Sequence, residues 1–217
     1  MVLEIIKSTE YHKSQWAHGE TTELYLFPRD SSYAARTFKW RVSAATVDAD
    51  TSTFTVLFGV RRWIMPFDAE LHLTHAHNDK PLYSITLKPY ESHCFKGDWE
   101  TQSIGKAGDF NLMLKDDAYG ILKPVKINEG SEIMLGTLFH EAFDERLPLA
   151  DHQLTLGLYS RDFDMTLNTG DGTEKLQRGD LMLIHYTLEE VDHIKQFTMD
   201  HRGEKSGHAV LFAVTTM

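Results

Sequence analysis

The 217-residue sequence has a single cysteine, Cys94, and no long apolar stretch. One thiol cannot form a disulfide bond within the chain, and no apolar run approaches the roughly 20 residues that a membrane-spanning helix requires. Residues 1–7 carry an acid where a signal peptide has its basic region, and no hydrophobic region follows. These absences predict a soluble, cytoplasmic protein that has no membrane partner.

Positive charge is also scarce. There are 22 Lys and Arg residues against 32 Asp and Glu residues, so the formal net charge is −10. Non-specific binding of nucleic acid requires a basic surface, and no basic run or stripe supplies one. We therefore expect no nucleic-acid partner. The hydrophobic share of 41% is ordinary for a globular protein with a substantial core.

The sequence also lacks the common catalytic motifs. It contains no Gly-x-Ser-x-Gly elbow, no Walker loop and no dinucleotide-binding glycine pattern. His93 and Cys94 are neighbours in an apolar run, so on a strand their side chains would point to opposite faces and could not form a Cys–His pair. No catalytic residue is predicted from these patterns.

The densest group of histidines lies between His72 and His77. On a strand, His75 and His77 would share a face, as metal ligands often do. Residues 76–80, however, have the composition of a hairpin turn, and no acidic residue stands at the spacing found in metal-binding cupins. We therefore expect His75 and His77 to lie in a polar turn, and we predict no bound metal and no cofactor.

Short runs rich in Val, Ile, Thr, Phe and Tyr recur between Gly, Asp, Asn and Pro, which is typical of strands and turns. The expected strands are Glu23–Phe27, Thr37–Val47, Arg62–Met65, Glu70–His75, Leu82–Leu87, Phe110–Leu114, Gly120–Ile127, Ile133–Phe139, Gln153–Leu158, Asp164–Leu167, Leu181–Tyr186 and Ala209–Thr215. About a dozen such strands predict an all-β barrel or sandwich. The segment Leu188–Phe197 allows one or two helical turns.

No Gly/Ser-rich linker and no repeat divides the chain. We place the boundary at Asn128–Ser131, where Gly, Asn and Ser gather, which gives halves of residues 1–128 and 129–217. Because no true linker joins them, we expect the halves to pack as one compact unit. A fold with many strands and few helices leaves sheet edges uncovered, so we also expect a homodimer.

The segment Phe38–Val47 predicts a strand in which Arg41 and Ser43 point to the same face. An arginine between apolar residues either pairs with an acid inside the fold or binds an anionic ligand. Single polar residues interrupt or begin three other apolar runs in the same way, namely Glu23, Arg62 and Asn111. Four strands with inward polar groups would line the mouth of a barrel, where small ligands commonly bind.

Five segments of the first half, taken in order, resemble the HutD/Ves family of bacterial proteins. They are Trp16–Glu23, Phe38–Val47, Phe54–Arg62, Phe95–Asp98 and Asp109–Met113. The remainder of the chain matches the family in general character only. Ala17, His18 and Glu20 depart from the usual opening of the family, which reads Trp-Arg/Lys-Asn-Gly-Gly-Gly-x-Thr.

The resemblance implies a cupin-type β-barrel, built as a bicupin with few short helices and without the metal-binding histidines. HutD members are associated with histidine-utilisation genes, and the resemblance implies a protein that binds a small pathway metabolite and restrains the pathway. Ves members are associated with cold or stress induction. The positions that match the family pattern, and that we take as ligand-binding candidates, are Thr22, Glu23, Arg41, Ser43, Arg62, Asp98 and Asn111.

Three functions stay open at this point. In the first, the chain is a non-enzymatic regulator whose arginines bind the carboxylate of formimino-glutamate, formyl-glutamate or urocanate. Glu23 then accepts a hydrogen bond from an amine or formimino nitrogen, while Ser43 and Asn111 orient the ligand. In the second, it is a cupin-type enzyme, which would need a metal-binding set such as two histidines and a carboxylate. In the third, it is a structural or interaction module, and Arg41–Glu23 is an internal ion pair.

Overall fold

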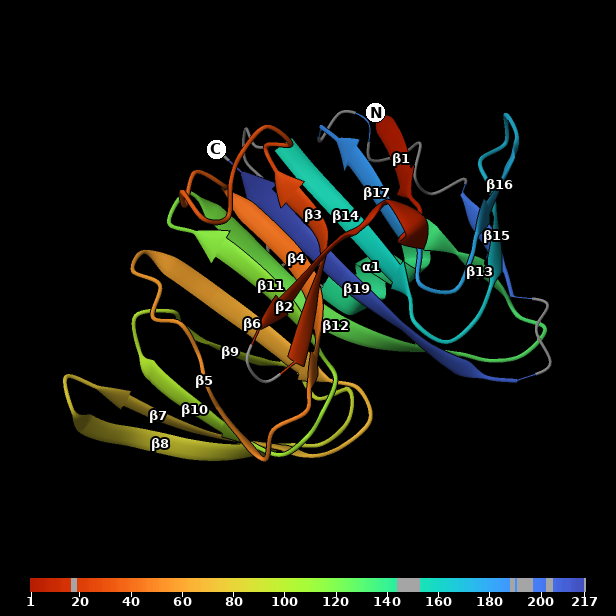
Figure 1. Ribbon diagram of the computed structural model, residues 1–217. Coiled ribbons are helices and arrows are strands. Elements are labelled where there is room, and N and C mark those ends of the chain that lie inside the picture. Colours follow the sequence, from red (N-terminus) through yellow and green to blue (C-terminus); the bar gives the residue numbers. More distant parts are fainter. Residues whose placement is uncertain (17–18, 144–152, 188–189, 191–196, 202–204, 217) are drawn as a thin grey trace. The chain divides into compact units, whose positions relative to one another are not determined.

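The computed structural model describes residues 1–16, 19–143, 153–187, 190, 197–201 and 205–216 (Figure 1). This part of the chain is mostly β-strands joined by turns and loops, and it also contains the 3-10 helix η1 (Ser8–Glu10) and the α-helix α1 (Leu135–Phe143). The predicted all-β class is therefore confirmed. Within the described residues, no helix is both long and apolar enough to cross a membrane.

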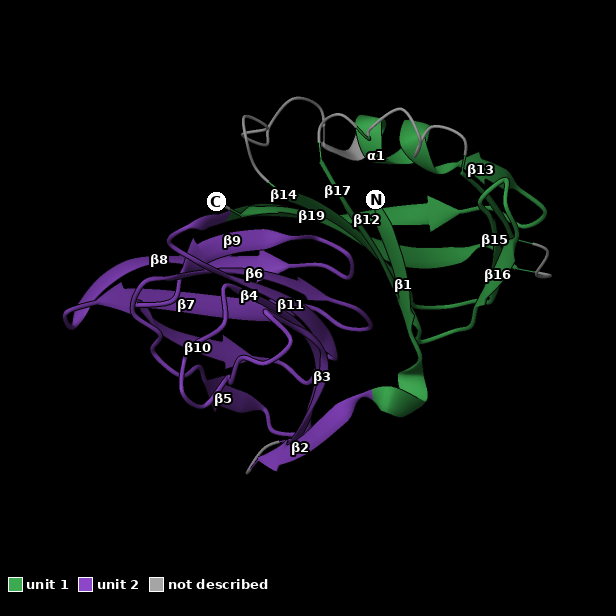
Figure 2. Cartoon of the chain, turned by 90° about the horizontal axis from the view of Figure 1, so that it is seen from above, with its two compact units in different colours: residues 1–10, 119–217 green, residues 11–118 purple. Residues whose placement is uncertain are grey.

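The described chain divides into two compact units, drawn in different colours in Figure 2. One unit is contiguous and comprises Tyr11–Ala118, whereas the other combines Met1–Glu10 with Tyr119–Met217. The division therefore differs from the expected boundary at residue 128. The reason is strand pairing. Strand β12 (Ala118–Ile127) belongs to a sheet of the discontinuous unit, and β1 (Val2–Ile6) pairs with β17 (Leu181–Tyr186) of the same unit. Packing of the two halves as one compact unit stays a prediction.

The contiguous unit consists of two antiparallel sheets. The six-stranded sheet has the order β2 (His12–Trp16), β3 (Gly19–Phe27), β4 (Trp40–Val47), β11 (Asp109–Lys115), β6 (Val60–Pro66) and β9 (His93–Lys96). The four-stranded sheet has the order β5 (Thr51–Thr53), β10 (Glu100–Ile104), β7 (Leu71–His77) and β8 (Lys80–Leu87).

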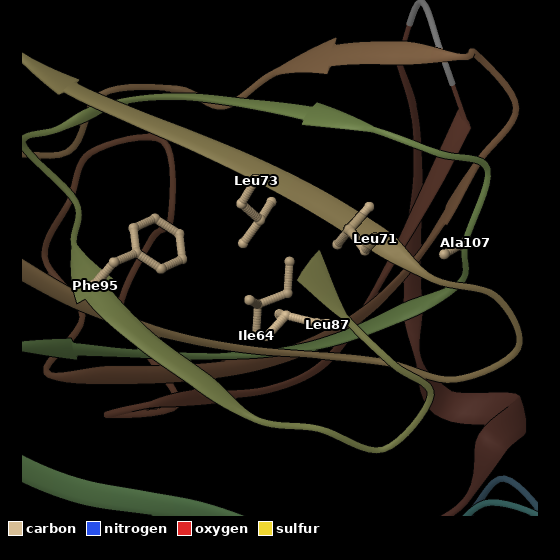
Figure 3. Packing of buried hydrophobic residues seen from close by; sticks show 6 residues of the cluster. All are labelled: Ile64, Leu71, Leu73, Leu87, Phe95 and Ala107. Atoms are coloured by element: carbon tan, nitrogen blue, oxygen red, sulfur yellow. The ribbon is translucent and has the colours of Figure 1, made fainter. Parts of the chain in front are cut away.

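A hydrophobic core joins these two sheets. Ile64 of β6 and Phe95 of β9 pack with Leu71 and Leu73 of β7 and Leu87 of β8, as Figure 3 shows. Leu71 and Leu73 are alternate residues of β7, so their side chains share the face that packs in this core. The result is a jelly-roll-like pair of sheets that does not close into a single barrel.

The discontinuous unit contains a five-stranded and a four-stranded sheet. The first has the order β1, β17, β14 (Gln153–Ser160), β19 (Gly207–Thr216) and β12, and the second has the order β13 (Glu132–Met134), β18 (Thr198–Asp200), β15 (Met165–Asn168) and β16 (Thr173–Leu176). Strand β17 is buried along its whole length, and Leu181, Met182 and Leu183 have no exposed surface. Strands buried on both faces read as continuous apolar runs, which is why this strand was found from the sequence.

The expected strand Ile133–Phe139 is wrong over most of its length. Only residues up to Met134 are extended, in β13, and the chain then forms α1. Leu135 and Phe139 are buried and four residues apart, which is the spacing of one helix face. The short apolar run Ile133–Phe139 fits the period of a strand as well as that of a helix, and most of it is helical in the structure. The expected helical turns at Leu188–Phe197 lie almost wholly outside the described residues.

Candidate functional site

The contiguous unit contains a cavity of about 620 Å³ over one face of its six-stranded sheet. Alternate residues of β4 face it, beginning with Arg41 and Ser43, and so do Asp109 and Asn111 of β11. The strand register brings these positions into rows, since Ser43 lies opposite Glu23 on β3 and opposite Asn111 on β11. We call this the arginine cavity and define its polar wall by Glu23, Arg41, Ser43, Arg62, Asp109 and Asn111.

Five of the predicted ligand-binding residues meet in the arginine cavity, namely Glu23, Arg41, Ser43, Arg62 and Asn111. Thr22 and Asp98 do not line it. Thr22 lies between Thr21 and Glu23 on β3, so its side chain points away from the face that these two neighbours present to the cavity. Asp98 stands in the turn between β9 and β10.

Arg41 already has protein partners on two sides. Its Nε donates a hydrogen bond of 2.7 Å to Glu23 Oε2, and its Nη1 donates one of 3.0 Å to Ser43 Oγ. The guanidinium also lies 4.2 Å from the centre of the Tyr33 ring, in a cation–π arrangement. The side chain of Arg41 is 6% exposed and that of Glu23 is 24% exposed. The ion pair considered in the structural hypothesis is therefore present, and it stands on the wall of the cavity.

Arg62 is less fully satisfied. Its Nη2 donates a hydrogen bond of 3.2 Å to Asn111 Oδ1, whereas its buried Nε has no hydrogen-bond partner in the described structure. The guanidinium lies 4.7 Å from the ring centre of Phe54 and 5.4 Å from that of Phe95. Burial lowers the pKa of Arg62 to about 10, which still leaves the side chain cationic at neutral pH. The cavity thus contains a buried positive charge with an unused donor.

Asp109 completes the polar wall, and the sequence analysis missed it. Asn111 Nδ2 donates a hydrogen bond to Asp109 Oδ1, so that Asn111 joins Arg62 to Asp109. Burial raises the pKa of Asp109 to about 7, although the nearby Arg62 charge acts in the opposite direction. The signal was available, because Asp109 stands two residues before Asn111 and therefore shares its face of β11.

The histidine segment has a different structure from the one expected. Strands β7 and β8 are joined by a two-residue turn at Asn78 and Asp79, which both have positive φ (53° and 59°). The expected hairpin is confirmed, but His75 and His77 belong to β7, and the expectation that they lie in the turn is wrong. His75 is 2% exposed and packs against Tyr83 of β8.

No described residues form a group of three His, Cys, Asp or Glu side chains that is able to hold a metal ion. The discontinuous unit contains a cavity of about 710 Å³ beside β15 and β16. The lysines and arginine that line it, Lys175, Arg178 and Lys205, are exposed, unlike the buried arginines of the arginine cavity. The arginine cavity is therefore the better candidate site, because it presents buried charge in a partly enclosed space.

A family model for HutD matches residues 8–196 of this chain. The chain belongs to the HutD family. No curated protein sequence matches it. Three solved structures show the fold shared by this HutD-family chain, and all have low sequence identity to it.

The first is a conserved protein of unknown function, PA5104 from Pseudomonas aeruginosa PAO1, with 18% identity and a TM-score of 0.67 over 99% of this chain and 98% of that one. The second is HutD from Pseudomonas fluorescens SBW25 in the formate condition, with 17% identity and a TM-score of 0.62 over the whole of both chains. The third is a vicilin from Solanum melongena, with 10% identity and a TM-score of 0.62 over 98% and 84%. Oxalate decarboxylase structures, including variants from Bacillus subtilis, are also similar. The predicted cupin-type bicupin fold is confirmed by these likenesses.

Proposed function

We propose that this HutD-family protein is a non-enzymatic regulator that binds a small carboxylate-bearing metabolite in the arginine cavity. The observation that carries the proposal is Arg62, a buried arginine on the cavity wall whose side chain makes a single hydrogen bond among the described residues, from Nη2 to Asn111. A buried donor on a charged group without a partner is unfavourable. A carboxylate can accept from the nitrogens of one guanidinium in the bidentate geometry that arginine favours.

The remaining wall residues suit a ligand with further polar groups. Glu23 lines the cavity, and its side chain is a quarter exposed although it pairs with Arg41. Its carboxylate can therefore also accept a hydrogen bond from an amine or formimino nitrogen of a ligand. Metabolites of histidine degradation, such as formimino-glutamate, formyl-glutamate and urocanate, combine a carboxylate with such nitrogen or formyl groups. The related HutD of Pseudomonas fluorescens is described in a formate condition, and formate is the smallest carboxylate. These features support the choice of ligand class.

Thermal denaturation with formate, N-formyl-L-glutamate and urocanate tests the proposal. A ligand that binds only the folded state raises the unfolding free energy by about 2.7 kcal/mol at a hundredfold excess over its dissociation constant. For a domain of this size that corresponds to a rise in melting temperature of several degrees. We expect at least one of these compounds to produce such a rise, and Arg62→Gln to remove it.

Arg61→Gln is the matched control for this substitution. Arg61 is the neighbouring residue on β6 and is exposed, so it points away from the cavity while its replacement makes the same change of charge. The proposal is contradicted if the ligand effect persists in Arg62→Gln, or if no compound stabilises the protein. Its non-enzymatic part is tested by proton NMR of the bound compound, which should be recovered chemically unchanged after long incubation.

A further inference from the structure

The charges on the wall of the arginine cavity are balanced before any ligand enters. Arg41 is bonded directly to Glu23, and Arg62 is connected to Asp109 through the side chain of Asn111. When both acids are ionised, these four side chains have no net charge. An anion that binds at Arg62 would therefore add one uncompensated negative charge to a buried site, and burial of unpaired charge is strongly unfavourable.

Asp109 is the group on this wall that is placed to remove that charge. It is 3% exposed and faces the cavity from β11, and its Oδ1 accepts a hydrogen bond from Asn111 Nδ2. If a proton is added to its carboxyl group, the acceptor role toward Asn111 is kept and one O–H donor is gained. The titratable or charged groups that line the cavity or face Asp109 are His12, Glu23, Tyr33, Arg41, Arg62 and Asp68.

Glu23 is less suited to accept the proton. Its carboxylate is bonded directly to Arg41 at 2.7 Å, so a proton added to Glu23 would break an existing ion pair. Asp109 is connected to Arg62 through Asn111, and the negative charge of Asp68 raises the pKa of Asp109. Proton addition at Asp109 therefore breaks no direct ion pair.

We propose that, when Asp109 is ionised in the free protein, each carboxylate bound at Arg62 is taken up together with one proton from solvent, which is added to the carboxyl group of Asp109. The inference rests on the function proposed above and goes beyond it, because it assigns to Asp109 the role of matching the cavity to the charge of its ligand. The bound state then contains a neutral acid beside the ligand carboxylate, able to donate a hydrogen bond to it. This arrangement favours ligands that place a single carboxylate, with one negative charge, beside Arg62.

The direction of the pH dependence follows from linkage. In the empty cavity burial holds the pKa of Asp109 at about 7, and a negative ligand nearby raises it further. Above pH 7 the free protein has lost this proton and the complex regains it, so the affinity falls as pH rises, by up to about tenfold per pH unit. Below pH 7 both forms are protonated and the affinity levels off.

Isothermal titration with formate in HEPES and in Tris at the same pH measures the protons taken up, because the two buffers differ in ionisation enthalpy. Formate is a suitable probe, since its one ionisable group stays charged throughout. We expect uptake to approach one proton per formate at pH 8 and to approach zero at pH 6. Asp109→Asn should abolish the uptake and make the dissociation constant independent of pH, while Asp79→Asn in the β7–β8 turn should change neither.

The outcomes separate this inference from the proposed function. Formate binding without proton uptake at pH 8 overturns the inference alone, as does uptake that persists in Asp109→Asn or that disappears in His12→Gln. If no carboxylate binds at all, both proposals are wrong. Should Asp109→Asn fail to fold, carbon-13 NMR of the wild-type carboxyl groups replaces it, because the Asp109 resonance should titrate at a higher pH when formate is added. A resonance that does not move contradicts the inference.

Discussion

Arg41 and Arg62 stand in the same cavity, but their partners differ. Arg41 donates to Glu23 and to Ser43 and stacks on Tyr33, so most of its interactions are internal. Arg62 has one hydrogen bond to Asn111 and an unused buried Nε. We therefore expect removal of Arg41 to affect stability first and removal of Arg62 to affect binding first.

Replacement of Arg41 by Ala should lower the free energy of unfolding by roughly 2–4 kcal/mol without any ligand. The reason is that Glu23 loses its partner, and a buried pair broken on one side typically costs about 3–5 kcal/mol, reduced here because Glu23 is a quarter exposed. Denaturant unfolding measures the loss, and the double variant Arg41→Ala with Glu23→Gln should recover part of it. A loss within about 0.5 kcal/mol, as expected for exposed positions, would show that the pair is not a structural one.

His75 should stay neutral well below the pH at which histidines usually take up a proton. Burial lowers its pKa to about 4, and the nearby His93 acts in the same direction. Between the ordinary value near 6.5 and about 4, the unfolded chain therefore binds a proton that the folded chain does not. The contribution of His75 to the free energy of unfolding is therefore fully present above pH 6.5, and it is lost as the pH falls toward 4. Nitrogen-15 NMR of the histidine rings checks this, and a charged His75 at pH 5.5 would contradict it.

Most of the cavity wall could be predicted from single residues. Glu23, Arg41, Ser43, Arg62 and Asn111 were found because each polar side chain interrupts or begins an apolar run, and alternation then fixes its face. Asp109 was missed because an acid at the start of a strand looks like a turn residue. His75 was misplaced because the turn was expected to include the histidines, whereas Asn78 and Asp79 alone make it, both with the positive φ that these residue types tolerate.

At the scale of elements, close packing between β14 and β19 depends on one glycine. Gly157 lies opposite Phe212, and a Cβ atom at residue 157 would come within 2.0 Å of the Phe212 ring. The absent side chain leaves the space that the ring fills. This contact explains why a largely buried strand has a glycine in its interior.

Replacement of Gly157 by Ala should therefore destabilise the protein by about 1–3 kcal/mol through overpacking. Gly172→Ala is the matched control, since nothing lies within 4 Å of the corresponding Cβ position and its φ is not positive. Thermal unfolding compares the two variants. The double variant Gly157→Ala with Phe212→Leu should be less perturbed than expected from the sum of the single effects, and strict additivity would contradict the proposed clash.

Elements were predictable where their periodicity was unambiguous. Strand β2 was missed because all five of its residues are exposed, so it has no hydrophobic alternation. Helix α1 was missed because its short apolar run fits two periods, and only its packing through Leu135 and Phe139 resolves them. Strand β2 pairs with β3, the next strand in the sequence, so a polar hairpin was overlooked, whereas α1 contacts β19, which is distant from it in the sequence.

At the scale of the whole molecule, assembly stays a prediction. Strand β8 is the last strand of its four-stranded sheet, and Leu82 and Tyr83 on it are 44% and 41% exposed. An exposed edge strand favours association with another strand. We expect light scattering at micromolar concentration to give twice the mass of one chain, and Leu82→Lys to shift the protein toward the monomer. A wild-type protein with the mass of one chain would rule this out.

The division into units was the least accessible feature from sequence. The pairing of β1 with β17 joins residues about 180 positions apart, and no local pattern announces such a partner. The Asn128–Ser131 segment has the composition of a boundary, but β12, which precedes it, belongs to the five-stranded sheet of the discontinuous unit.

This connectivity has a consequence for the order of events during synthesis. Every strand of the unit that contains the arginine cavity has left the ribosome once residue 118 has emerged. The other unit must wait for β19, and its first strand meanwhile stays without its pairing partner β17. We therefore expect the nascent chain to acquire its arginine cavity first, because domains generally fold as units during synthesis.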